Sequence, residues 1–115
     1  MHELAIAEAL VAIACDHADG RRVTRVDVKV GHLRQVLPSA LELSFELAAA
    51  ETPAAGAALA IEEVPVEAIC RSCQAHGHQV AFPFCCPACG GFDLEIVRGE
   101  ELLVDCLEVT DAVAA

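Results

Sequence analysis

The stretch Cys70-Arg71-Ser72-Cys73, followed after twelve residues by Cys86-Pro87-Ala88-Cys89, decides how this chain folds. Two cysteines three positions apart on a tight turn can occupy neighbouring corners of a tetrahedron, and two such turns complete a closed four-thiolate zinc site. A closed site has no open position at which water could be activated, so its contribution is to folding. We therefore predict that Cys70, Cys73, Cys86 and Cys89 bind one structural Zn(II).

Two other interpretations of the four cysteines stay open at this point. A rubredoxin-like electron carrier would hold iron in the same paired knuckles, although the chain has no Trp or Tyr to wall such a site. A zinc-ribbon interaction module would hold zinc and show no nickel affinity. Cys85 is a spare thiol that could replace its neighbour Cys86, and His76 and His78 on the spacer are interpreted as surface side chains.

The residues before the cysteine stretch carry regular patterns of apolar side chains. Helical spacing starts at Glu3 and ends at His17, where Asp19-Gly20 provides a stop signal, and Pro38 suits the first turn of a second helix. Valines alternate with charged residues in front of Gly31, as in a half-buried strand. The expected elements are a helix over 3–17, a strand over 25–30, a helix over 38–51 and a strand over 59–64. Ile13 is predicted on the apolar stripe of the first helix, and Leu37 on that of the second.

The segment 66–97 interrupts these patterns, because it lacks helical periodicity and holds the clustered cysteines. After it, Leu102–Val109 is apolar and β-branched enough to return as a strand of the first sheet. We predict an α+β fold: a small sheet of about three strands packed with two helices, plus a zinc-ribbon-like lobe with a four-cysteine site, inserted before the last strand. The expected domains are 1–65 together with 98–115, and 66–97.

Composition excludes several classes of function. Seven basic against eighteen acidic residues give a net charge of −11, the wrong sign for binding nucleic acid. No apolar stretch approaches the ~18 residues of a membrane span, and no secretory signal precedes the first helix, so we expect a cytoplasmic protein. No catalytic motif stands out, which argues against an enzyme. The isolated Cys15 and Cys106 are predicted to be buried, small apolar residues.

The first three residues, Met1-His2-Glu3, could form a second metal site. An α-amine, the following amide nitrogens and an imidazole can close chelate rings in one plane, and square-planar nitrogen coordination selects Ni(II) or Cu(II) over Zn(II). Both the amine and the imidazole must lose a proton, so binding should weaken in acid. Taken alone, a His at position two is more often a solvated terminus than a ligand, and Glu3 is explained equally well as an acidic residue in a first helical turn.

The whole pattern resembles the HypA family of hydrogenase and urease nickel-maturation chaperones. The resemblance covers essentially the whole chain. The matching features are Met1-His2-Glu3, a strand ending at Val30-Gly31, a Pro38-started helix with Phe45, the two knuckles, and a tail with Gly99-Glu100-Glu101-Leu102 and Leu107-Glu108-Val109. Ser39, where the family tends to have Glu, and the extra Cys85 are departures.

The resemblance implies a nickel carrier without catalytic activity. His2 would provide the nickel imidazole, supported by the Met1 amine and the amides of His2 and Glu3, while the four knuckle cysteines would hold zinc. Ni(II) would be cargo for the [NiFe]-hydrogenase large subunit precursor, delivered together with a nickel-handling GTPase. A homodimer is compatible with these expectations, which include neither nucleic acid nor membrane as a partner.

Overall fold

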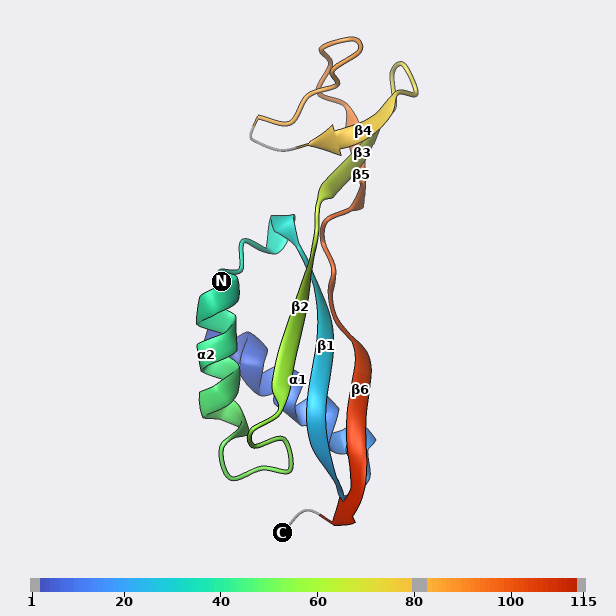
Figure 1. Cartoon of the computed structure of the whole chain (residues 1–115). Coiled ribbons are helices and arrows are strands. Elements are labelled where there is room, and N and C mark those ends of the chain that lie inside the picture. The colour runs from blue at the N-terminus through green and yellow to red at the C-terminus, as the bar shows by residue number, and fades with distance from the viewer. Residues whose placement is uncertain (1–2, 80–82, 114–115) are drawn as a thin grey trace.

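The computed structural model describes residues 3–79 and 83–113 and shows an elongated molecule measuring 58 × 23 × 15 Å (Figure 1). Two helices and a three-stranded sheet form its larger part, and a second three-stranded sheet extends from one end. The predicted α+β class is confirmed. None of the helices in the described ranges is long and apolar enough to cross a membrane.

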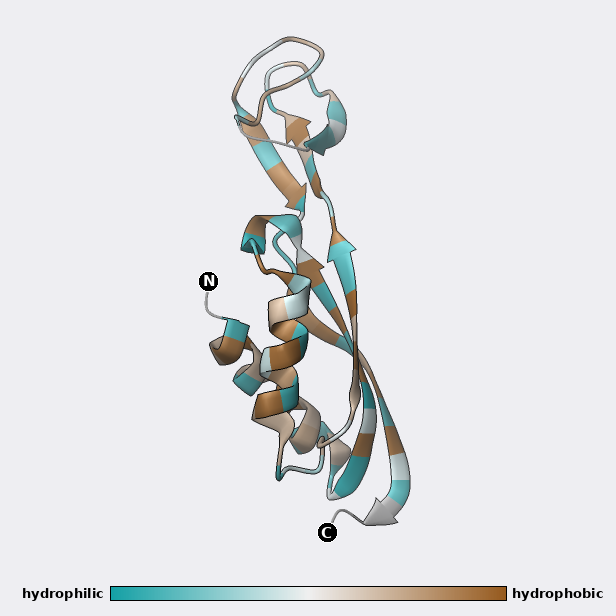
Figure 2. Ribbon diagram, turned by 60° about the vertical axis from the view of Figure 1, so that its left-hand side comes forward, coloured by the Kyte–Doolittle hydropathy of each residue, from teal (hydrophilic) through white to brown (hydrophobic). Residues whose placement is uncertain are grey.

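The first sheet is built around β1 (Arg21–Gly31) in the order β2-β1-β6. The edge strand β2 (Ala58–Val64) runs parallel to β1, and β6 (Leu102–Val113) runs antiparallel to it. Val26, Val28 and Val30 are buried, while the charged residues between them are not. The alternation predicted from the sequence is therefore present, and it is visible as banding along these strands in Figure 2.

Helix α1 (Glu3–Ala18) and helix α2 (Pro38–Ala49) pack against each other and close one face of this sheet (Figure 1). Asp19 and Gly20 end α1 in the left-handed region, with φ of 53° and 82°. The buried stripe of α2 is Leu41, Phe45 and Ala49, spaced four residues apart. Burial of these apolar side chains between helices and sheet is the main source of stability in this part of the molecule.

Two expectations about the helices differ from the structure. Leu37, predicted to belong to the buried stripe of the second helix, is 60% exposed, because it is the residue before the helix and has an extended backbone. Ile13, predicted on the apolar stripe of the first helix, is 42% exposed. It falls outside the arc formed by Leu10, Val11 and Ala14, which faces the sheet.

The second sheet has the order β4-β3-β5 and is inserted before the last strand of the first sheet, as predicted. Its central strand β3 (Val66–Cys70) follows β2 after the single residue Pro65. The flanking strands, β4 (His76–Gln79) and β5 (Leu94–Arg98), both pair antiparallel with β3. Because β3 continues directly from β2, the second sheet prolongs the long axis of the molecule (Figure 1).

The junction between the sheets, which we call the neck, depends on two glycines. Gly31 donates its N–H to the carbonyl of Glu101 at 2.7 Å, and Leu33, in the short 3-10 helix η1 (His32–Arg34), donates to Gly99 at 2.9 Å. A Cβ on Gly31 would overlap the backbone of Gly99. Gly99 itself has φ of 115° and lies against Val66. Only residues without a side chain allow the two segments to approach this closely.

Cys106 corrects a further expectation, because it is exposed and not buried. Its strand contains an irregularity: Val28 pairs with Val104, but the next residue back along β1, Asp27, pairs with Cys106 and skips Asp105. The extra residue reverses the alternation and places Cys106 beside Asp27 on the face away from the helices. Cys15 is partly buried and packs against the core.

Candidate metal centre

The first cysteine knuckle starts where β3 ends. Cys70 is the last residue of that strand, and its N–H donates to the carbonyl of Ala75 at 2.8 Å. Gln74 donates its N–H back to the carbonyl of Cys70, also at 2.8 Å, and adopts a left-handed backbone with φ of 68°. These two bonds close a tight turn that directs Cys70 and Cys73 to the same side.

The second knuckle repeats this geometry. The N–H of Cys86 donates to Gly91 at 2.8 Å, and the N–H of Gly90 donates to Cys86 at 2.8 Å. Gly90, with φ of 76°, occupies the position that Gln74 occupies in the first knuckle. A glycine adopts this conformation without cost, whereas a side chain costs about 1 kcal/mol. The two turns therefore share the same backbone hydrogen bonds, although different residues occupy the left-handed position.

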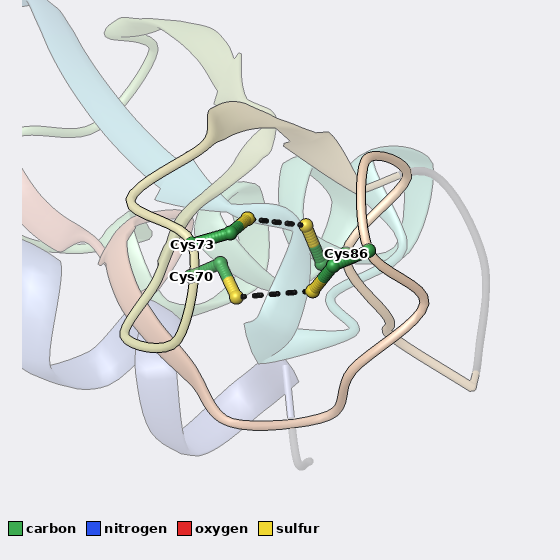
Figure 3. Close-up of side chains that lie close together, drawn as sticks. Cys70, Cys73 and Cys86 are labelled. Atoms are coloured by element: carbon green, nitrogen blue, oxygen red, sulfur yellow. Dashed lines mark hydrogen bonds between the residues drawn. The ribbon is translucent and has the colours of Figure 1, made fainter.

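The four sulfur atoms of the two knuckles converge. The Sγ atoms of Cys70 and Cys89 are 3.7 Å apart. Those of Cys73 and Cys86 are 3.4 Å apart, and Figure 3 shows these two side chains pointing toward each other. All four lie within 4.8 Å of one another. A tetrahedron with Zn–S bonds of about 2.3 Å has edges of about 3.8 Å. The donor set thus fits one tetrahedral ion, with sulfur–sulfur distances that need to change by no more than about 1 Å.

Backbone amides favour thiolates at two of the four positions. The N–H groups of Cys89 and then Ala88 lower the pKa of Cys86 to about 6, against the desolvating effect of burial. The N–H groups of Cys73 and Ser72 lower the pKa of Cys70 in the same way.

The neighbouring cysteines raise the pKa values of the other two thiols, those of Cys73 and Cys89. Cys73 receives a bond from the amide of Ala75, which lowers its pKa, but its thiol contacts with Cys86 and the other cysteines raise that pKa to about 12. The pKa of Cys89 is likewise raised, by Cys70 and Cys86, despite the amide of Gly91. A bound divalent cation would favour the deprotonated form at all four positions.

The centre is braced on one side and open on the other. Cys70 and Cys86 are buried, while Cys73 and Cys89 are exposed. Arg71 ties the first knuckle to the segment after the second one, with its N–H donating to the carbonyl of Asp93 at 2.9 Å and its guanidinium contacting the Asp93 carboxylate at 2.9 Å. Cys85 is outside the four-sulfur group, and its N–H donates to the side chain of Gln79.

Of the three residues predicted to bind nickel, the structure describes only Glu3. Met1 and His2 lie outside the described residues. Glu3 starts α1, and its carboxylate accepts a hydrogen bond from the N–H of Leu37 at 3.3 Å. The start of the first helix is therefore attached to the residue that precedes the second helix.

One residue that contacts two basic side chains, Glu67, was not predicted from the sequence. Glu67 on β3 has a carboxylate that is only 18% exposed and lies 2.7 Å from His76 Nε2 and 3.8 Å from Arg98 Nη1. Nothing in its local sequence marks Glu67, because the contact depends on the register between β3 and β4. His76 and His78 are exposed, as expected.

Fold and site together define a small α+β protein with a four-cysteine metal centre. The family model described as hydrogenase/urease nickel incorporation, metallochaperone, hypA matches residues 1–109. The chain therefore belongs to the HypA family of nickel metallochaperones. It is a maturation factor and not an enzyme.

Relatives and solved structures agree with this assignment. A hydrogenase maturation factor HypA from Geotalea uraniireducens is 44% identical, with 95% of this chain and 99% of the relative covered. One from Nostoc is 36% identical, with 96% and 97% covered. The solution structure of the Ni metallochaperone HypA from Helicobacter pylori is 26% identical and superposes with a TM-score of 0.67, covering 95% of this chain and 97% of that one.

Proposed function

We propose that this protein carries Ni(II) on Met1-His2-Glu3 and delivers it to the [NiFe]-hydrogenase large subunit precursor, while zinc in the four-cysteine centre maintains the fold. The observation that carries the proposal is the closed geometry of that centre in a member of a nickel metallochaperone family. Four thiolates around one ion leave no position for exchange, so a cargo ion needs other ligands.

Zinc suits the role of the resident ion. Four sulfurs at near-tetrahedral spacing are the donor set of structural zinc sites, which contribute roughly 10 to 16 kcal/mol in small zinc peptides. The lobe around it, 66–97, has short strands and few buried apolar residues of its own. We propose that it folds as a separate metal-stabilised domain, attached to the nickel-binding domain of 1–65 and 98–115.

Nickel suits the nitrogen donors at the start of the chain. The His2 imidazole, the Met1 amine and the amides of His2 and Glu3 would form a planar site, a geometry that favours Ni(II) over Zn(II). The Glu3 side chain, through its bond to Leu37, would hold that site beside the junction of α1 and α2. A few residues at a chain end are also held by few contacts, which suits transfer by ligand exchange.

We also propose partners, a compartment and an oligomeric state for nickel transfer. A nickel-handling GTPase would act with the protein in the cytoplasm, and the carrier could function as a homodimer. Light scattering of the nickel-free and nickel-loaded chain measures the oligomeric state. Co-purification with the GTPase and the large subunit precursor tests the two partners.

The deciding experiment is a calorimetric nickel titration of the zinc-loaded chain with an unblocked Met1. Three proteins are compared: the wild type, His2→Ala, and an N-terminally acetylated variant of the wild type, which blocks the amine and keeps the imidazole. We expect about one tight Ni(II) in the wild type and its loss in both variants, with zinc retained in all three. Equal tight binding by all three proteins, or by none, would refute the nickel site.

A further inference from the structure

The outer face of the second sheet gathers imidazole and carboxylate groups that the four-cysteine centre does not use. His76 and His78 alternate on β4, so both side chains project from the same face. Glu67 is the direct register partner of His78 across the β3–β4 ladder and therefore lies on that face too. Val66, Ala68 and Cys70, which alternate with it, are buried on the opposite face.

From this juxtaposition, we propose that His76, His78 and Glu67 form a second, surface site for a divalent transition-metal ion such as Ni(II). Two imidazoles and one carboxylate are donors that Zn, Ni and Cu accept, and their open arrangement leaves positions for water. The site shares no ligand with the four-cysteine centre or with Met1-His2-Glu3. It is a distinct binding activity of the lobe and does not rest on the N-terminal nickel site.

The spacing of the donors supports the proposal. His76 Nε2 and Glu67 Oε1 are 2.7 Å apart. Two ligands at about 2.1 Å from one ion lie about 3.0 to 3.4 Å apart at angles between 90° and the tetrahedral value. An ion could thus enter between this pair after a separation of a few tenths of an ångström.

The third donor is within reach by side-chain rotation. The Cα atoms of His76 and His78 are about 6.7 Å apart in an extended strand, and directly opposed residues have Cβ atoms about 5 Å apart. The His78 side chain is exposed and makes no hydrogen bond or ion pair within the ranges 3–79 and 83–113. It can therefore turn toward Glu67 without breaking an existing contact.

The surroundings of Glu67 orient it for this role. Arg98 is its register partner on β5, and the guanidinium contacts Oε2 at 3.8 Å. The other oxygen, Oε1, is the one that faces His76. Arg98 thus fixes the orientation of the carboxylate, and the oxygen Oε1 faces His76. The limited exposure of the carboxylate reduces the screening of its charge by water.

The test uses the full, zinc-loaded chain with His2→Ala, so that the N-terminal site cannot contribute. Three variants are added to this background: His76→Gln, His78→Gln and Glu67→Gln. The matched control is His32→Gln, because His32 also faces one carboxylate, that of Glu63 at 3.9 Å, but has no second histidine beside it in the strand pattern. The probe is NiCl2, followed by calorimetry and by paramagnetic broadening of the histidine resonances.

We expect one more weakly bound Ni(II) per chain in the background protein, distinct from the tight ion that His2→Ala loses, with preferential broadening of His76 and His78. Each histidine variant should weaken binding at least tenfold, Glu67→Gln should weaken it several-fold, and His32→Gln should leave it unchanged. Zinc content, measured in each protein, should stay constant. Absence of nickel binding in the background protein, binding by the histidine variants as tight as that of the background protein, or nickel uptake only at the expense of zinc would overturn the proposal. The N-terminal site is judged separately, by the difference between the wild type and His2→Ala.

Discussion

Replacing Gly31 by alanine should open the neck without disturbing either metal site. The new Cβ would lie 2.6 Å from the backbone nitrogen of Glu100 and closer still to the carbonyl of Gly99. Carbon needs about 3.5 Å from such atoms, and both neighbours are backbone, so the strands must separate by about 1.5 Å to clear the Gly99 carbonyl. The bonds Gly31 to Glu101 and Leu33 to Gly99, now 2.7 and 2.9 Å, would then exceed the range of a hydrogen bond.

The cost follows from these distances. Two lost backbone bonds contribute about 1 kcal/mol each, and the residual overpacking adds a further 1 kcal/mol or more, giving about 3 kcal/mol in total. With a urea dependence of about 1.5 kcal/mol per molar, the unfolding midpoint should fall by about 2 M. Circular dichroism of the helices in zinc-saturated protein measures this shift.

Gly77→Ala is the matched control for this prediction. Gly77 lies in β4 with nothing within 4 Å of its would-be Cβ, so we expect a change below about 0.5 kcal/mol. Elemental analysis should give the same zinc content for both variants. A Gly31→Ala midpoint within about 0.3 M of the wild type would refute the close approach of residues 31 and 99, and equal losses in both variants would show that glycine replacement itself is responsible.

Three further predictions concern the core, the thiols and the neck carboxylate. Phe45→Ala should lower the free energy of unfolding by about 3 to 5 kcal/mol, because Phe45 is 2% exposed, whereas Leu47→Ala, 65% exposed, should change it little in the same denaturation assay. Cys86→Ser should abolish stable zinc binding, and Cys85→Ser should keep one zinc per chain by elemental analysis; the reverse result would move the ligand to Cys85. The amide of Gly99 lowers the pKa of Glu101, so the ionised carboxylate stabilises the fold fully above its ordinary pKa of about 4.3 and loses this effect as the pH falls through the lowered value. Glu101→Gln should therefore be less stable than the wild type at pH 7 and equally stable at strongly acid pH, and a constant difference across urea titrations at these pH values would contradict the assignment.

How much the sequence predicted depends on the range of the interactions involved. The helices and the valine alternation of β1 follow from local periodicity, and their positions were predicted to within a few residues. The knuckles follow from fixed Cys-x-x-Cys spacing, so the four sulfurs that converge are the four expected. The exposure of Cys106 depends on one skipped residue in β6, and the partnership of Glu67 with His76 depends on strand register. Neither leaves a local pattern, since pairing between strands is decided by packing across the sheet.

Ligand chemistry gives a physical reason for keeping two metals apart in the proposed carrier. Affinity alone does not protect a site, because copper exceeds both nickel and zinc in most donor sets. Four soft thiolates in a closed tetrahedron retain their ion by offering no position for an incoming ligand, and hydrogen bonds hold the turns of both knuckles closed. Nitrogen donors at a chain end do the opposite, since each can leave in turn. A protein that needs one ion to stay and another to depart is therefore expected to separate them by donor type, and the two proposed sites of this chain would differ in that way.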